Sequence, residues 1–261
     1  MSISETIIRH YNKNERAEQV LKQANAAASL SQDDINPYDQ MHVGGHHATA
    51  AFFQRLPIKA DQHILDIGSG LGGPARYLAS RYRARVSGID LTASLCEQAS
   101  FLAEKTKLSN NVKFQAGDAT ALPFEAQHFD MAYTIHVAMN IHDRDSLYSE
   151  AFRVLKPGSL FGLYDVMLTD KNSTLEFPMP WSNVSDGSHL ITKEQTQKNL
   201  EHAGFKIIEG HDYTNEGLQH LRAARDKTEK DGKQEPQKFL NLEKALGENI
   251  LRAHMIIAQK P

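Results

Sequence analysis

A glycine-rich turn between a strand-like run and a helix-like run constrains this chain more than any other feature. The apolar residues Ile64, Leu65 and Ile67 are typical of a strand buried on both faces. Four glycines follow within residues 68–73, and Pro74 then opens a segment with helical spacing whose apolar face leaves Arg76 outside. Proline suits the first turn of a helix, where its missing N–H costs nothing. The sequence therefore predicts a strand, a tight turn and a helix N-terminus.

Such a turn attracts a negative or polar group, because backbone N–H groups and the positive end of the helix dipole converge on it. Gly68, Gly70 and Gly73 satisfy the dinucleotide pattern, and Asp90 follows about 20 residues later, which taken alone favours NAD. Asp66 disfavours NAD, because a carboxylate pointing into the turn would repel the pyrophosphate of that cofactor. It would suit a cationic ammonium. S-adenosylmethionine has an ammonium, a sulfonium and one carboxylate, so the pattern favours this methyl donor over NAD.

Composition narrows the class of protein without identifying it. The 261 residues carry a net charge of −3, which gives no reason to expect nucleic acid as a partner. The single cysteine, Cys96, excludes intrachain disulfides and cysteine-based zinc sites. No apolar run reaches the length of a membrane span, so we expect a cytoplasmic protein, monomeric or homodimeric. We expect one domain over 1–261, divided into an N-terminal helical cap (1–58), a cofactor-binding core (59–168) and a region of lid, last strands and inserted helices (169–261).

Strand-like and helix-like segments alternate after the glycine turn, which predicts a parallel, doubly wound sheet with ligands at the carboxyl ends of its strands. Further strands are expected at 85–89, 112–115, 129–135, 160–167, 205–208 and 253–258. Helices are expected at 48–55, 93–107, 144–155, 192–203 and 239–251, with Lys156-Pro-Gly158 stopping the third of them. Residues 1–35 are interpreted as two polar helices, 36–47 as a turn-rich segment and 226–237 as a solvated linker.

Histidines are dense near the first turn-rich segment, but they do not form a metal motif. His42 and His46 are one helical turn apart, and His47 follows. No carboxylate or cysteine is spaced to complete a ligand set, and two glycines interrupt any helix there. We therefore expect no metal.

Five motifs occur in order between residues 65 and 158: Leu65–Gly72, Gly88–Asp90, Gly117–Phe124, Phe129–Asp130 and Arg153–Gly158. On these motifs the chain resembles the class I S-adenosylmethionine-dependent methyltransferases. Segments 38–45, 136–141 and 178–181 are similar to the sarcosine/dimethylglycine N-methyltransferase-like branch (methyltransferase type 11). The resemblance implies a Rossmann-like, doubly wound α/β fold with a seven-stranded sheet, mostly parallel with the last strand antiparallel, and helical N-terminal and C-terminal caps.

The resemblance also implies roles for individual residues toward S-adenosyl-L-methionine and its product, S-adenosyl-L-homocysteine. Asp90 would accept both ribose hydroxyls, while Asp118 would accept from the adenine amino group. Ile135 and His136 would lie near the sulfonium. The cofactor-binding residues expected are Gln40, Val43, Gly44, Asp66, Gly68, Ser69, Gly70, Asp90, Leu91, Asp118, Ala119, Ile135 and His136.

The acceptor of the methyl group is expected to be a small molecule, with an amine nitrogen of the sarcosine/dimethylglycine kind favoured. O- or C-methylation of a lipid, sterol, quinone or phenol is the alternative, and an NAD-dependent oxidoreductase or a catalytically idle binding protein is more remote. Candidate catalytic residues are His136, Asn140 and His42; the substrate-binding candidates are Gln40, Asp165, Trp181 and His189. Related phosphoethanolamine-type enzymes have a histidine where this chain has Asn140, which weakens a base-catalysed mechanism.

Two turn-rich segments are expected to close over the cofactor as lids. They are Tyr38–His47 and Trp181–His189, with Gly44, Gly45 and Gly187 as hinges. Closure would exclude water and hold the nucleophile in line with the methyl group.

Overall fold

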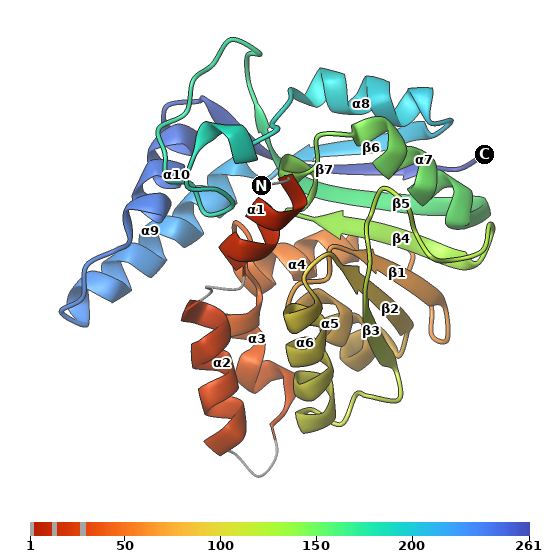
Figure 1. The fold of residues 1–261 in the computed structure, drawn as a ribbon, viewed down its shortest axis with the longest axis horizontal. Coiled ribbons are helices and arrows are strands. Elements are labelled where there is room, and N and C mark those ends of the chain that lie inside the picture. The colour runs from red at the N-terminus through yellow and green to blue at the C-terminus, as the bar shows by residue number, and fades with distance from the viewer. Residues whose placement is uncertain (1–2, 12–14, 27–29) are drawn as a thin grey trace.

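The computed structural model describes residues 3–11, 15–26 and 30–261, and its centre is one seven-stranded sheet (Figure 1). The order is β3-β2-β1-β4-β5-β7-β6, and β7 runs antiparallel to both of its neighbours while the other pairs are parallel. The predicted fold class is therefore confirmed. The strands are β1 (His63–Ile67), β2 (Arg85–Asp90), β3 (Val112–Ala116), β4 (Phe129–Ile135), β5 (Leu155–Leu168), β6 (Lys206–Asp212) and β7 (Leu251–Gln259).

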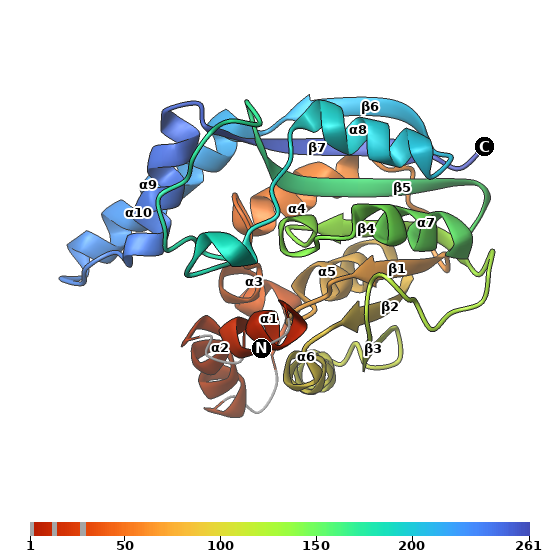
Figure 2. The same ribbon diagram turned by 45° about the horizontal axis from the view of Figure 1, so that its top comes forward.

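Helices cover both faces of this sheet: α4 and α5 lie on one face, and α7 and α8 lie on the other (Figure 2). The described helices are α1 (Ile3–Tyr11), α2 (Glu15–Ala26), α3 (Gln32–Asp39), α4 (Gly45–Gln54), α5 (Gly73–Tyr82), α6 (Ala93–Lys105), α7 (Arg144–Val154), α8 (Lys193–His202), α9 (Thr214–Lys230) and α10 (Gln237–Gly247), with short 3-10 turns η1 (Ala138–Asn140) and η2 (Ser185–Gly187).

The sheet divides the hydrophobic core into two clusters, one on each face, because successive side chains of a strand point to opposite faces. In β4, Met131 and Tyr133 belong to the cluster under α4 and α5, whereas Ala132 belongs to the cluster under α7 and α8. Phe52 and Phe53 of α4 are fully buried in the first cluster. Burial on both faces explains why β4 is mostly apolar.

Several expectations about element boundaries are wrong. Part of the segment expected to be turn-rich is helical, since α3 continues to Asp39 and begins with a capping box between Ser31 and Asp34. The expected end of the helix before Lys156 is confirmed, since α7 ends at Val154, but the following strand begins at Leu155 rather than at residue 160. The N–H of Gly158 donates to the carbonyl of Lys260 at 2.8 Å, which draws this stretch toward the end of the chain.

The expected linker 226–237 is wrong at its start and end. Helix α9 extends to Lys230, and α10 begins at Gln237, so only residues 231–236 connect the two helices. An ion pair between Arg225 and Glu243, at 2.7 Å, ties α9 to α10. The charged composition of the segment reflects the solvated surface of a helix rather than a loop.

Arg76 is predicted to lie outside the apolar face of its helix, but in the structure it is completely buried. Its guanidinium pairs with Asp39 Oδ2 at 2.5 Å, and it donates to Gln32 Oε1 and to the carbonyl of Leu71. Since Gln32 and Asp39 both belong to α3, this arginine attaches α3 to α5. Burial of a charge is tolerated here because the partners satisfy it.

Candidate functional site

A cavity lies at the carboxyl ends of the central strands, on the side where α1, α2 and α3 gather (Figure 2). It holds about 980 Å³ of space between atoms, part of it open to solvent. The turns after β1, β2, β3 and β4 form one wall, and α1 with the segment before α4 forms the other. The structure brings twelve of the predicted site residues to this cavity: His42, Asp66, Gly68, Ser69, Gly70, Asp90, Leu91, Asp118, Ala119, Ile135, His136 and Asn140.

The glycine turn after β1 forms the floor of this cavity. Gly68 has φ +80°, and a Cβ there would lie 2.3 Å from a methyl group of Val137, so only glycine fits. Gly70 has φ +50°, and a Cβ on it would meet only Met41 Cε, at 3.6 Å, on the cavity side. The backbone of the turn is therefore open to a ligand at Gly70.

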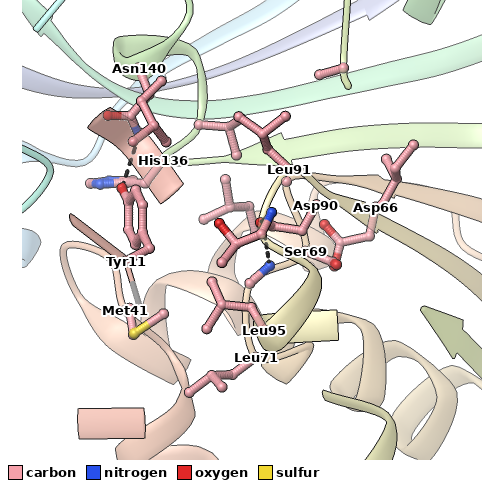
Figure 3. Close-up of a pocket in the computed structure, with 18 of the residues that line it drawn as sticks. Tyr11, Met41, Asp66, Ser69, Leu71, Asp90, Leu91, Leu95, His136 and Asn140 are labelled. Atoms are coloured by element: carbon pink, nitrogen blue, oxygen red, sulfur yellow. Dashed lines mark hydrogen bonds between the residues drawn. The ribbon is translucent and has the colours of Figure 1, made fainter. Parts of the chain in front are cut away.

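Asp90, at the end of β2, holds this turn in place. Its Oδ2 accepts from the N–H of Gly70 and its Oδ1 from the N–H of Thr92, both at 2.9 Å (Figure 3). Burial raises the pKa of this carboxyl. A carboxylate has about four lone-pair sites, so each oxygen can accept a further hydrogen bond from a ligand.

Asp66 is buried at the end of β1 and its Oδ2 has no hydrogen-bond partner within the described chain. Burial raises the pKa of Asp66 to about 7 and the nearby Asp90 adds to the effect, while the hydroxyl of Tyr133, which interacts with this carboxyl, opposes it. Ser69 Oγ is likewise buried without a partner among those residues. Unsatisfied buried acceptors are rare in folded proteins and indicate a missing partner. At Asp66 the natural partner is a cation.

Asp118 lies at the rim of the cavity and is exposed. Its Oδ1 accepts from the backbone N–H and the hydroxyl of Thr120, at 2.8 and 2.7 Å. Leu91, from the turn after β2, and Ala119 also line the cavity. The rim thus combines an acidic acceptor with small apolar surfaces.

Uncharged polar groups gather at the other end of the cavity. Asn140 Nδ2 donates to the hydroxyl of Tyr11 at 2.9 Å, and the ring of His136 lies beside them (Figure 3). Asn140 Oδ1 and His136 Nε2 are buried without a hydrogen-bond partner in the described part of the chain. Burial, reinforced by His42, lowers the pKa of His136 well below its usual value. His136 is therefore a neutral imidazole near pH 7.

The backbone of His136 has φ +54°, which is unusual for a residue with a side chain. Its N–H donates to the carbonyl of Tyr164 at 2.8 Å. His42 faces it with 5.8 Å between ring centroids, and His42 Nε2 lies 3.0 Å from both the Gly45 carbonyl and Thr49 Oγ1. Backbone strain of this kind is concentrated at functional sites.

Sequence reasoning misses the contribution of α1 to this cavity. Ile7, Tyr11 and Met41 line it, together with the predicted residues. Residues 1–35 are interpreted from their pattern as packing helices, and nothing in that local pattern separates Tyr11 from an ordinary surface aromatic. Its partner Asn140 lies 129 positions away.

Three predicted site residues near the start of α4 lie outside the cavity wall. Gln40 is buried and accepts from the Thr49 hydroxyl at 2.7 Å, which places it behind His42. Val43 is in the main core cluster, and its carbonyl accepts from Tyr164. Gly44, with φ +80°, packs closely against Ala48 and Tyr213.

The three remaining substrate candidates also lie away from the cavity. Asp165 is buried beside Arg144 in a separate small cavity, and burial raises its pKa to about 7. Trp181 is in the core and donates to Ser188 Oγ at 2.9 Å. The backbone N–H of His189 donates to the carbonyl of Met139. Of the two expected lids, segment 38–47 lines the cavity through Asp39, Met41 and His42, and segment 181–189 contributes no lining residue.

Within the described ranges, no helix is long and apolar enough to cross a membrane. The same residues contain no group of three or more His, Cys, Asp or Glu side chains that could hold a metal ion.

Known proteins similar to this chain share both its motifs and its fold. Residues 65–163 match a family model described as "Methyltransferase domain". The chain is 32% identical over 158 residues to a sterol 24-C-methyltransferase of Debaryomyces hansenii, a match covering 59% of this chain and 42% of that protein. It is 30% identical over 200 residues to phosphoethanolamine N-methyltransferase 1 of Arabidopsis thaliana, covering 76% and 39%. The matches thus span about two fifths of the length of these curated relatives.

Among solved structures, the fold is similar to that of geranyl diphosphate C-methyltransferase from Streptomyces coelicolor A3(2). The TM-score is 0.79 at 14% identity, and the match covers 100% of this chain and 98% of the other. That protein was crystallised with Mg²⁺, geranyl diphosphate and S-adenosyl-L-homocysteine. At this identity the likeness concerns the fold alone.

Proposed function

We propose that the chain is a class I S-adenosylmethionine-dependent methyltransferase and that it transfers a methyl group from S-adenosylmethionine to a small-molecule acceptor, since residues 65–163 match the model of a methyltransferase domain. The single observation that carries the proposal is the unpartnered, buried carboxylate oxygen of Asp66 beside an open glycine turn. An ammonium ion satisfies that oxygen, whereas a pyrophosphate is repelled by it.

The residues of the cavity fit the cofactor in three parts. Asp66 would receive the ammonium, and Gly70 would let the methionine moiety approach the backbone. Asp90 has lone pairs left for ribose hydroxyls, and Leu91, Asp118 and Ala119 offer an apolar surface and an acceptor for adenine. When bound, the cofactor supplies an electrophilic methyl group on a sulfonium with a neutral leaving group.

The chain's own residues then orient the acceptor and exclude water. Asn140, Tyr11 and His136 lie together at the end of the cavity away from Asp66, where they can hold a nucleophile by hydrogen bonds. Alignment of the nucleophile is the main requirement of such a displacement. We favour an amine nitrogen as the acceptor atom, and carbon or oxygen is the alternative. The relatives named above include both a C- and an N-methyltransferase.

Calorimetric titration with S-adenosylhomocysteine, S-adenosylmethionine and NAD⁺ tests the proposal. We expect the first two to bind and NAD⁺ not to bind.

Asp90→Ala should weaken binding of S-adenosylhomocysteine by about 1.5–3 kcal/mol, the scale of hydrogen bonds to a charged group. Circular dichroism should show that this variant is folded, and Asp145→Ala, an exposed change on α7, should leave the affinity unchanged. Binding of NAD⁺ alone would refute the proposed function.

A further inference from the structure

We propose that the methyl acceptor is an uncharged amine on a largely apolar skeleton without phosphate or carboxylate, and that Asn140 Oδ1 and His136 Nε2 receive its N–H. This inference rests on the proposed methyl transfer and specifies its substrate class. The end of the cavity that holds Tyr11, His42, His136 and Asn140 is called the acceptor chamber below.

The charge of the cavity wall excludes an anionic acceptor. Among the described lining residues there are four aspartates, Asp39, Asp66, Asp90 and Asp118, and no lysine or arginine. The bound cofactor would bring one carboxylate together with its own ammonium, so an acceptor with a further phosphate or carboxylate would find no lysine or arginine among these residues to pair with, which costs several kcal/mol.

Neither of the two buried arginines of the described chain is available to supply that counter-ion. The Arg76 guanidinium pairs with Asp39 and donates to the carbonyl of Leu71 at 2.6 Å. Arg144 donates to the carbonyls of Ile141 and His189, at 2.9 and 2.8 Å. Both side chains are therefore engaged by groups of the protein itself.

The acceptor chamber is otherwise apolar. The apolar residues Ile7, Met41, Val137 and Ile141 line the same cavity as Tyr11 and Asn140, with Met41 and Val137 also bordering the glycine turn. Their side chains offer no hydrogen bonds to a polyhydroxylated or zwitterionic molecule, but they favour a hydrocarbon or aromatic skeleton through burial of apolar surface. The chamber suits an apolar acceptor with one polar atom.

The unpartnered groups in the chamber indicate what that polar atom carries. Asn140 Nδ2 is already used by Tyr11, which leaves Oδ1 as an acceptor with no partner in the described chain. His136 Nε2 is also unsatisfied there. A ligand N–H or O–H would satisfy them, whereas an alkene carbon would not.

An amine fits these groups better than a hydroxyl does, because it can release its proton to water before it binds and then needs no base in the reacting step. A hydroxyl must lose its proton as it reacts, but burial keeps His136 neutral at a low pKa and raises the pKa of Tyr11. A neutral amine attacks with its own lone pair. The N–C bond forms as the S–C bond breaks, sulfur keeps the bonding pair, and the product leaves as an ammonium that loses its proton to water.

The test is transfer of a labelled methyl group from S-adenosylmethionine to four matched acceptors. They are 1,2,3,4-tetrahydroisoquinoline, its 3-carboxylate, the phenol 5,6,7,8-tetrahydro-2-naphthol, and a sterol with a side-chain alkene. We expect kcat/KM for the uncharged amine to exceed that of each other acceptor by at least about tenfold, which corresponds to 1.4 kcal/mol.

Ile7→Arg is the variant that probes charge selection, because Ile7 lies on the cavity wall and is partly exposed on α1. It should raise the ratio of kcat/KM for the carboxylated amine to that for the plain amine. Ile208→Arg, at an exposed position on β6, is the matched control and should leave the ratio unchanged.

Preferred turnover of the carboxylate, the phenol or the sterol overturns this inference. So does the absence of turnover of all four acceptors in a protein that binds S-adenosylhomocysteine. Turnover of any of these acceptors is itself methyl transfer and leaves the proposed function intact, and the calorimetric titration with S-adenosylhomocysteine tests cofactor binding separately.

Discussion

Asp66 is the residue at which stability and ligand binding oppose each other. Its carboxyl is buried without a partner for Oδ2, and its pKa is raised to about 7, whereas an aspartate in an unfolded chain titrates near 4. The folded protein therefore retains a proton that the unfolded chain releases. By linkage, this group makes the protein less stable as the pH rises from about 4 to about 7.

Asp66→Asn should remove that penalty. At pH 8 we expect the ligand-free variant to be more stable than the wild type by about 2–4 kcal/mol, and the difference should shrink toward pH 5. Urea denaturation at both pH values measures it. Asp165 has a pKa that is also raised to about 7. The stability of the variant should therefore still depend in part on pH.

The same substitution should abolish measurable binding of S-adenosylhomocysteine, because the ammonium loses its charged partner. Glu125→Gln, which removes one negative charge at an exposed position, serves as the control and should change neither property. If the Asp66→Asn protein is less stable than the wild type at pH 8, or binds the ligand as the wild type does, this account of the residue is contradicted.

At the scale of elements, α3 depends on α5 for its position. Arg76 of α5 is fully buried and connects to Asp39 and Gln32 of α3. Removing one partner of a buried ion pair leaves an uncompensated charge. Arg76→Met should therefore lower the free energy of unfolding by about 3–5 kcal/mol, measured by urea denaturation.

The double variant Arg76→Met/Asp39→Leu should recover part of that loss, since no charge is then left unpaired. Arg153→Met, which removes a more exposed ion pair with Glu150 on α7, is the comparison and should cost much less. Equal losses for the two single variants would be inconsistent with the role given to Arg76.

Helix α1 lines the cavity through Ile7 and Tyr11, and its described hydrogen bonds join Tyr11 to Asn140 and His10 to the carbonyl of Pro180. Binding of S-adenosylhomocysteine should therefore slow hydrogen exchange in α1 and at Met41 and His42. Segment 181–189 packs into the core through Trp181, so its exchange should not change, and residues 231–236 should exchange fast in both states. Protection of 181–189 without protection of α1 would restore the lid expected from the sequence.

For the whole molecule, the sequence predicts well what local patterns encode. The glycine turn, the alternation of strands and helices, and the acids at the ends of β1 and β2 follow from spacing and backbone geometry. The cavity accordingly contains Asp66, Asp90 and Gly70 as expected. These features need no knowledge of what lies across the fold.

Features that depend on distant partners could not be predicted in this way. Arg76 looks solvent-exposed in the pattern of its own helix because Asp39 lies 37 positions away. Tyr11 meets Asn140 only after the chain has folded. The sequence assigns Gln40 to the ligand, but in the structure its amide bonds to Thr49. A polar side chain near a site looks the same in sequence whether it faces the ligand or supports a neighbour.

Determining the structure of the complex with S-adenosylhomocysteine tests the central claim most directly. The account predicts the amino group of the ligand within hydrogen-bond distance of Asp66, its ribose hydroxyls on Asp90, and its sulfur directed toward Tyr11, His136 and Asn140. A ligand bound elsewhere, or bound in this cavity with its amino group away from Asp66, would contradict the account.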